Sequence, residues 1–367
     1  MNHDTLQDAH ALLNARPSDA QPSRRTALKA AAGAGFAAAV LPVTAQTLVV
    51  TSSEGLLAGP VKIDVGGYAL PAYRAAPLNA KNAPVVLVVP EIFGLHEHIA
   101  DVTRRLARLG YMAIAPDLMA RQGDASSYAD MGKLMAEVVS KVPDAQVMAD
   151  LDATVAWAAG NGGDTARLAI TGFCWGGRIV WLYTAHQPKI KAGIAWYGRL
   201  VGQSTPTTPQ HPVDVAAKLH APVLGLYGGA DTGIPQATVD AMQAALAAAP
   251  APAKASQFVV YPDTPHAFHA DYRPSYRKEA AQDAWQRLTQ WLKQHGVYAW
   301  WFCKARVSDG FVCYFYRHPV CGRGQRLACR CPEFWGAGAL YAAHAEPGGW
   351  RLAGHGFHAP AARSLSK

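Results

Sequence analysis

Short hydrophobic runs alternate with amphipathic segments along the middle of the chain, from about residue 61 to residue 295. The run 84–90 (Pro-Val-Val-Leu-Val-Val-Pro) is typical of a strand that is buried on both faces. Residues 61–72 form two shorter runs around Gly66-Gly67 and predict a hairpin. Further strands are expected at 111–115, 167–171, 190–197, 222–227 and 257–261.

Helices are expected between these runs, because apolar residues recur there every three or four positions. In the segment 98–109, Ile99, Val102 and Leu106 share one face. The other predicted helices span 126–140, 144–160, 176–186, 236–248 and 276–295. Strands that alternate with helices predict an α/β fold with a mostly parallel sheet flanked by helices on both faces. Such a sheet places its functional site in the loops that follow the carboxyl ends of the strands.

The composition suits one large globular domain or one domain with appendages, since half of the 367 residues are hydrophobic and 16% are charged. The formal net charge of +8 is unevenly distributed. From Tyr298 to the end, nine Lys and Arg residues stand against three acidic ones, whereas residues 46–297 are close to neutral. The basic character of the chain therefore does not indicate a nucleic-acid partner.

The first 45 residues have the three parts of a signal peptide. Arg24-Arg25 and Lys29 precede an uncharged, Ala-rich run over 30–43, and Val43-Thr44-Ala45 supplies small residues suited to cleavage. The paired arginines resemble a twin-arginine export signal. We therefore expect a periplasmic or secreted protein, without stable membrane insertion after cleavage because the apolar run is short. The alternative is a cytoplasmic protein with an Ala-rich N-terminal helix.

The segment Gly172-Phe173-Cys174-Trp175-Gly176-Gly177 joins a predicted strand directly to a predicted helix. It fits the nucleophile-elbow pattern Gly-x-nucleophile-x-Gly, with cysteine where serine is usual. Because the nucleophile of an elbow lies on a strained turn, its neighbours must be small. The N-terminus of the following helix favours a thiolate at Cys174, and the N–H of Trp175 is a natural oxyanion donor. A structural cysteine buried in a Gly-rich turn is the alternative.

An acid and a histidine should follow the nucleophile in that order. Asp231 lies in the loop after strand 222–227, and His266 lies in the loop after strand 257–261, so they are the candidate acid and base. Asp263 and His269 compete with them, but we interpret Asp263 as a turn residue and His269 as an ordinary wall or surface histidine. No second cysteine lies between residues 46 and 297, so Cys174 has no disulfide partner there.

The loop Glu91-Ile92-Phe93-Gly94 follows strand 84–90, where an α/β fold of this kind places its second oxyanion donor. The N–H of Ile92 is the candidate. Glu91 is unusual at this place, because a carboxylate repels the negative charge that develops in the oxyanion hole. It therefore needs a partner, either a cation or the thiol of Cys174. The alternative is a solvated loop carboxylate.

Five segments together resemble the dienelactone hydrolase (carboxymethylenebutenolidase) family of the α/β-hydrolase superfamily, over about residues 55–296. These segments are 91–94 (Glu-Ile-Phe-Gly), 116–121 (Pro-Asp-Leu-Met-Ala-Arg), the elbow 172–177, 229–231 (Gly-Ala-Asp) and 266–268 (His-Ala-Phe). The resemblance implies a Cys-His-Asp hydrolase that acts on lactones or enol esters. It also implies that Glu91 pairs with the resting thiol of Cys174 until substrate binds.

The resemblance also implies residues that bind the substrate. Arg121 matches an arginine that binds the substrate carboxylate, and a planar guanidinium suits that role. A second arginine of the family lies four residues beyond the catalytic histidine. This chain has Ala270 at that position, and its nearest arginine is Arg273. Phe93 and Tyr197 complete the candidate substrate-binding residues.

The tail 298–367 is rich in Trp, Cys, Arg and Gly and has no clear helical or strand period. Three interpretations compete. A zinc site would need paired Cys-x-x-Cys motifs, which the tail lacks. A disulfide module would leave one of five cysteines over. The third interpretation is a shifted reading frame through GC-rich coding DNA. The five cysteines are Cys303, Cys313, Cys321, Cys329 and Cys331.

We therefore predict a monomeric carboxylic-ester hydrolase that cleaves lactones or activated esters through a thioester acyl-enzyme. Its partner is a small-molecule substrate, and nothing in the sequence indicates a cofactor, a metal or a nucleic acid. A broad-specificity carboxylesterase or thioesterase is the alternative within the same chemistry. A non-catalytic α/β-hydrolase-like binding protein belongs to a different class, and the complete set of Cys, Asp and His argues against it.

Overall fold

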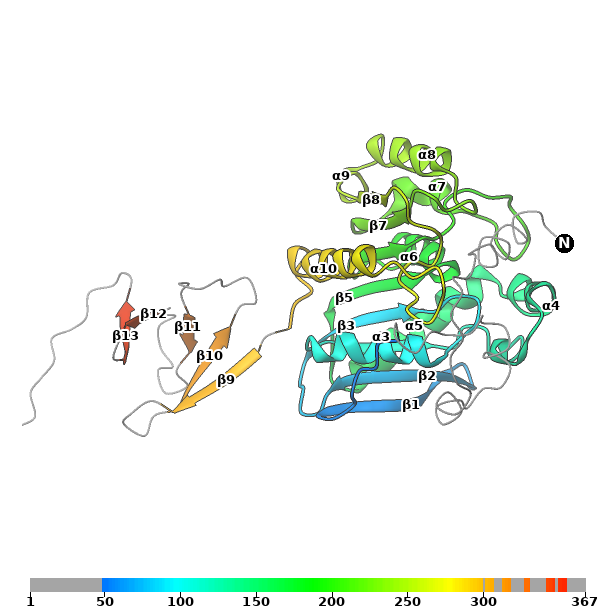
Figure 1. The fold of residues 1–367 in the computed structure, drawn as a ribbon. Coiled ribbons are helices and arrows are strands. Elements are labelled where there is room, and N and C mark those ends of the chain that lie inside the picture. Colours follow the sequence, from blue (N-terminus) through cyan, green and yellow to red (C-terminus); the bar gives the residue numbers. More distant parts are fainter. Residues whose placement is uncertain are drawn as a thin grey trace, which may run out of the picture. The chain divides into compact units, whose positions relative to one another are not determined.

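The computed structural model describes residues 48–299 and five strands of the tail (Figure 1). The chain divides into two compact units, Met1–Tyr298 and Ala299–Lys367. The predicted leader 1–45 lies outside the described residues. No helix within the described part is long and apolar enough to cross a membrane.

The first unit is built on an eight-stranded sheet with the strand order β1-β2-β4-β3-β5-β6-β7-β8. β1 pairs antiparallel with β2, β2 pairs antiparallel with β4, and all other neighbours are parallel. The predicted mostly parallel sheet is therefore confirmed. The strands are β1 (Leu56–Val65), β2 (Tyr68–Pro77), β3 (Ala83–Val89), β4 (Met112–Pro116), β5 (Gly163–Phe173), β6 (Ile190–Trp196), β7 (Val223–Gly228) and β8 (Gln257–Tyr261).

Helices cover both faces of this sheet. The connection from β3 through α3 to β4 moves toward the β1 edge of the sheet. The connections through α5 to β5 and through α6 to β6 move toward the β8 edge. Because parallel crossovers are right-handed, α3 lies on the opposite face from α5 and α6. Figure 1 shows α3 and α10 in front of the sheet. The helices are α3 (Glu97–Arg108), α4 (Met131–Glu137), α5 (Asp144–Gly160), α6 (Trp175–His186), α7 (Pro212–Val215), α8 (Gln236–Ala247), α9 (Ala251–Lys254) and α10 (Lys278–Gln294).

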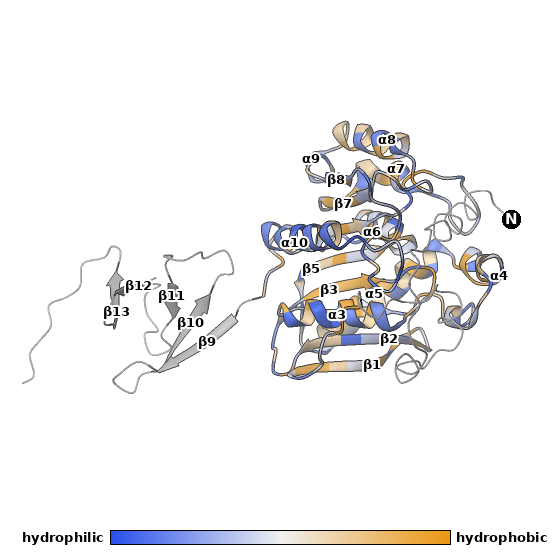
Figure 2. Ribbon diagram, viewed as in Figure 1, coloured by the Kyte–Doolittle hydropathy of each residue, from blue (hydrophilic) through white to orange (hydrophobic). Residues whose placement is uncertain are grey.

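The core lies along the central strands, as Figure 2 shows for β3 and β5. Every residue of β3 is buried, which explains why its sequence is hydrophobic without alternation. β1, at the edge of the sheet, has mostly exposed and half-buried residues instead. The candidate site residues follow the carboxyl ends of the parallel strands. They are therefore attached to a closely packed core.

One predicted helix is wrong. Residues 126–140 do not form one continuous helix. They are divided among a 3-10 turn, η2 (Ala125–Ser127), the short helix α4, and a second 3-10 turn, η3 (Val139–Lys141). Two aspartates set where η2 and α4 begin. Asp124 accepts a hydrogen bond from the N–H of Ser126 (3.0 Å), and Asp130 accepts one from Lys133 (2.8 Å), so each side chain starts a new helical turn.

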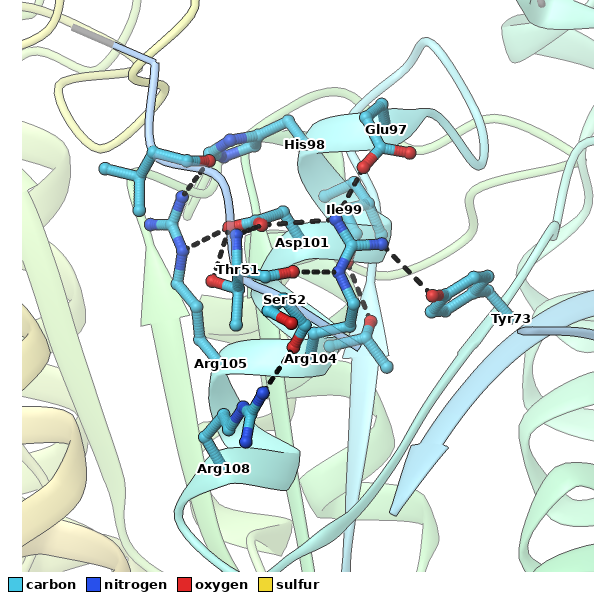
Figure 3. Close-up of polar contacts among 12 residues, drawn as sticks. Thr51, Ser52, Tyr73, Glu97, His98, Ile99, Asp101, Arg104, Arg105 and Arg108 are labelled. Atoms are coloured by element: carbon cyan, nitrogen blue, oxygen red, sulfur yellow. Dashed lines mark hydrogen bonds and ion pairs between the residues drawn. The ribbon is translucent and has the colours of Figure 1, made fainter. Parts of the chain in front are cut away.

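Residues 48–52 form an extended strap along α3 (Figure 3). The backbone of Thr51 is held twice, because its N–H donates to Asp101 (2.5 Å) and its carbonyl accepts from Nε of Arg104 (2.9 Å). The carbonyl of Ser52 accepts from Arg108 (2.9 Å). The packed unit therefore reaches back beyond residue 55, where the family resemblance begins.

The second unit contains a five-stranded antiparallel sheet with the order β13-β12-β11-β10-β9. These strands are not predicted from the sequence, which shows no clear period in the tail. The origin of the tail in a shifted reading frame stays a prediction. The strands are β9 (Trp301–Arg306), β10 (Val312–Arg317), β11 (Leu327–Arg330), β12 (Tyr341–Glu346) and β13 (Gly349–Gly354).

Candidate active site

Cys174 lies on a sharp turn between β5 and α6. Its φ of 54° and ψ of −115° lie in a region that residues with a side chain rarely adopt. The surrounding glycines are required by close backbone contacts. A Cβ at Gly172 would lie 2.4 Å from the carbonyl oxygen of Gly176, and one at Gly176 would lie 2.4 Å from that of Val89. The turn thus has the strained geometry that the Gly-x-Cys-x-Gly pattern predicts.

The strained residue is held at the start of α6. The N–H of Cys174 donates to the carbonyl of Trp196 in β6 (3.0 Å), and its own carbonyl accepts from Gly177 (2.9 Å). Its side chain is buried and forms no disulfide within the described part of the chain. The unpaired N–H groups and the dipole of the helix N-terminus favour a negative charge at this position.

Asp231 and His266 form a buried pair at the ends of β7 and β8. Nδ1 of His266 lies 2.6 Å from Oδ2 of Asp231, and the carboxylate also accepts from the N–H of Gly233 (2.9 Å). Since a carboxylate can only accept, the proton of this bond belongs to Nδ1. Burial alone lowers the pKa of His266, but the charges of Asp231 and Cys174 outweigh it and raise the pKa well above its usual value.

The other ring nitrogen of His266 points away from Asp231. Nε2 is buried. The side chain of Cys174 interacts with this imidazole, by charge and by a side-chain hydrogen bond, and adds to the rise in its pKa. The structure therefore brings together the three residues that the sequence singled out from three separate loops.

Glu91 is buried beside two residues that the sequence analysis did not connect with it. The hydroxyl of Tyr272 donates to Oε2 of Glu91 at 2.6 Å, and Nε2 of His96 lies 3.9 Å from the same oxygen. Burial lowers the pKa of His96 well below its usual value, with smaller effects of His98 and Arg273, so the ring stays neutral. Glu91 is therefore not a solvated loop carboxylate.

Arg273 lies in the same buried cluster. Its Nε donates to the hydroxyl of Tyr272 (3.2 Å), and its guanidinium lies 4.7 Å from the ring centroid of Phe93. Burial lowers the pKa of Arg273, but its interactions with Tyr272 and Glu91 raise it above its usual value, with a smaller contribution from Cys174. Nη2 has no hydrogen-bond partner among the described residues. A buried, charged donor without a partner suits the binding of an anionic group.

Tyr197 follows β6 with a φ of 37°, a second strained residue at this edge of the sheet. Its ring lies 5.1 Å from that of His266, and its hydroxyl is buried without a hydrogen-bond partner in the described part of the chain. Burial raises the pKa of Tyr197 well above its usual value, and Glu91 and Cys174 add to the effect. The hydroxyl thus stays protonated and can donate to a bound molecule.

The structure gives Arg121 a different environment. Its Nη1 forms a hydrogen-bonded ion pair with Asp150 of α5 (2.5 Å), and its guanidinium lies 4.1 Å from the ring centroid of Tyr68. The Asp150 side chain is fully buried. These two contacts tie Arg121 to α5 and β2, whereas Arg273 lies among Glu91, Phe93 and Tyr272. The predicted role of Arg121 in binding a carboxylate stays a prediction.

His269 lies in an aromatic wall. Its ring stacks on Phe173 at 5.2 Å and on Trp285 at 5.7 Å, and it approaches Trp196 to 4.5 Å. Burial lowers the pKa of His269 well below its usual value, with smaller effects of Arg105 and His98. These contacts agree with the interpretation of His269 as a wall histidine.

Comparisons with known proteins cover the same part of the chain. The model of the dienelactone hydrolase family matches residues 70–296. A protein of Methylorubrum extorquens named as a carboxymethylenebutenolidase is 62% identical over 276 residues, covering 75% of this chain and 94% of that protein. A protein of the same name from Salmonella typhimurium is 55% identical over 263 residues, covering 71% and 96%. A solved structure from Klebsiella pneumoniae, described as a dienelactone hydrolase, is 57% identical with a TM-score of 0.63, covering 65% of this chain and 99% of that one.

Proposed function

Because this chain belongs to the dienelactone hydrolase family of α/β-hydrolases, and is therefore a hydrolase of esters or lactones, we propose that it works through Cys174, His266 and Asp231 and a thioester acyl-enzyme. One observation carries this proposal. The strained elbow presents Cys174 near a buried histidine whose other nitrogen is bound to a carboxylate 2.6 Å away. That is the order of nucleophile, base and orienting acid that acyl transfer needs.

In the proposed reaction, the proton of the Cys174 thiol moves to Nε2 of His266. The thiolate then forms a bond to the carbonyl carbon of the substrate, while the N–H groups of Ile92 and Trp175 hold the oxyanion. Collapse of this intermediate breaks the bond to the ring oxygen and expels an enolate. The enolate takes a proton from water, and the resulting hydroxide attacks the thioester. The acid product leaves, and Cys174 is regenerated.

Glu91 serves the resting enzyme in this proposal. The family resemblance implies that the resting thiol pairs with this carboxylate. Oε1 of Glu91 is buried and has no hydrogen-bond partner among the described residues, so it can accept a proton donor such as a thiol. Substrate that enters the site would break this contact and turn Cys174 toward His266.

We propose Arg273, Tyr197 and Phe93 as the residues that bind substrate, with Arg273 as the site of a carboxylate. A second candidate function is a broad-specificity carboxylesterase or thioesterase. The ion pair of Arg121 with Asp150 favours it, because an arginine neutralised by its own carboxylate binds a second one less well. The two candidates differ in whether an anionic lactone is preferred over a neutral ester.

The proposal extends to the location of the protein. The leader pattern over residues 1–45 supports export to the periplasm or out of the cell by the twin-arginine route. Fractionation of the producing cells tests this. Full-length, uncleaved protein in the cytoplasm would contradict it.

The reaction is tested by assaying hydrolysis of p-nitrophenyl acetate and of a dienelactone with the purified protein and with Cys174→Ala. We expect the variant to lose turnover of both substrates, and iodoacetamide to inactivate the unchanged protein. Cys174→Ala keeps the five tail cysteines, so it is the matched control for alkylation at other sites. Mass spectrometry of the quenched reaction should find the acyl group on Cys174. Unchanged activity of the variant would overturn the proposal.

A further inference from the structure

We propose that Tyr272 is a positioning residue, which fixes the buried carboxylate of Glu91 and, with Arg273, clamps the loop Glu91-Ile92-Phe93. The inference rests on the proposed function, because it concerns the loop that carries the expected oxyanion donor Ile92. Neither Tyr272 nor its contact with Glu91 is apparent from the sequence, since the two residues are 181 positions apart.

The first half of the clamp acts on Glu91. This carboxylate is 1% exposed, and the hydroxyl of Tyr272 donates to its Oε2 at 2.6 Å. The other oxygen has no hydrogen-bond partner among the described residues. Burial of a carboxylate is unfavourable unless donors or cations surround it. The hydrogen bond from Tyr272 therefore stabilises Glu91 and fixes its position.

The second half of the clamp acts on Phe93. The guanidinium of Arg273 lies over the Phe93 ring at 4.7 Å, and its Nε donates to the Tyr272 hydroxyl at 3.2 Å. A charged donor on the phenol oxygen strengthens the bond that the phenol donates in turn. Two adjacent residues thus hold the first and third residues of the loop, and Ile92 lies between them.

Helix α3 holds the residue that precedes the clamp. Asp271, the residue before Tyr272, is fully buried and bound to Nδ1 of His98 (3.1 Å) and to Arg105 (2.5 Å), both on α3. Burial raises the pKa of Asp271, but its partners lower it to about 2, so it stays charged. Because Asp271 is held by α3, the position of the adjacent Tyr272 is fixed. Tyr272 in turn fixes the position of Glu91 in the loop 91–93.

The perturbation that isolates this role is Tyr272→Phe, which removes one hydroxyl and keeps the ring. Glu91 then loses its donor and moves with its loop. We expect kcat for p-nitrophenyl acetate to fall about tenfold to a hundredfold, as for a lost hydrogen bond to a charged group. KM should change little.

A double-mutant cycle shows whether the effect passes through Glu91. Glu91→Met fills a similar volume but cannot accept a hydrogen bond, so Tyr272→Phe should have a much smaller effect in that background. Where Glu91→Met is too slow to assay, the rate of Cys174 alkylation by iodoacetamide is compared across the same four proteins. Tyr183→Phe is the matched control, since it removes a buried hydroxyl on α6 that donates to Asp152 of α5 (3.0 Å), away from Glu91. It should leave kcat unchanged.

Two outcomes would overturn the inference. One is an unchanged kcat in Tyr272→Phe. The other is an equal effect of Tyr272→Phe in both Glu91 backgrounds. In either case, loss of turnover in Cys174→Ala would still support the proposed function. Failure of the unchanged protein to hydrolyse any ester would instead remove the proposed function itself, so the two failures are distinguishable.

Discussion

The substitution Gly176→Ala tests the elbow with a single added methyl group. At this position a Cβ would lie 2.4 Å from the carbonyl oxygen of Val89 and 2.6 Å from that of Pro90. Both are backbone atoms at the end of β3, so no side chain can rotate away to relieve the contact. To reach even 3.0 Å, the Val89 carbonyl must move by about 0.6 Å inside a close-packed core.

Two effects should follow from that displacement. Overpacking of this kind destabilises a protein by about 1–3 kcal/mol, which corresponds to a fall in Tm of about 2–4 °C for each kcal/mol. The displaced backbone also leads directly into Glu91 and Ile92. A shift on the order of 1 Å in a positioned group costs about a hundredfold in rate. We therefore expect kcat to fall about a hundredfold in a protein that is still folded at room temperature.

The assay combines kcat for p-nitrophenyl acetate with thermal unfolding followed by circular dichroism. Gly160→Ala is the matched control, because Gly160 ends α5 and a Cβ there would meet nothing within 4 Å. That variant should keep its kcat and gain up to about 1 kcal/mol of stability from the better helix propensity of alanine. If Gly176→Ala keeps both the kcat and the Tm of the unchanged protein, the steric reasoning about the elbow is wrong.

Two further predictions concern the acid and the wall histidine. Asp231→Asn should lower kcat by about four orders of magnitude in a folded protein, because an amide neither holds His266 in the right tautomer nor stabilises its charge; a loss below about threefold would contradict this. His269→Phe should flatten the pH dependence of stability. Because burial lowers the pKa of His269, the unfolded chain binds the proton first, so the free energy of unfolding should fall as the pH drops below about 6.5. Urea unfolding between pH 5 and pH 8 measures the free energy of unfolding of both proteins. Equal slopes of this free energy against pH would refute the reasoning.

Features that depend on local sequence are predicted well. The buried strands are recognisable because a sheet covered on both faces needs continuous hydrophobic runs, as β3 shows. The elbow is recognisable because its glycines are required by contacts within a few residues and with the neighbouring strand. Asp231 and His266 could be paired in advance because the carboxyl ends of adjacent parallel strands meet at one edge of the sheet.

Features that depend on tertiary contacts are not predicted. The bond between Tyr272 and Glu91 joins residues from opposite ends of the unit, and the only sequence signal is the run Asp271-Tyr272-Arg273 shortly after His266. The pairing of Arg121 with Asp150 depends on how α5 packs, which periodicity does not determine. The predicted helix 126–140 failed because capping by Asp124 and Asp130 outweighed its helical pattern.

The strap at residues 48–52 has a practical consequence for the start of the mature protein. Cleavage after Ala45, as the leader pattern predicts, would leave the whole strap on the enzyme. A recombinant chain started at residue 55 or at residue 70 would lack the Thr51 N–H on Asp101 and the Val49 N–H on Asp271 (3.4 Å). Asp271 precedes Tyr272, so such a chain would lose a donor one residue from the clamp on Glu91. The strap is thus part of the packed hydrolase unit, and recombinant protein should keep residues 48–52.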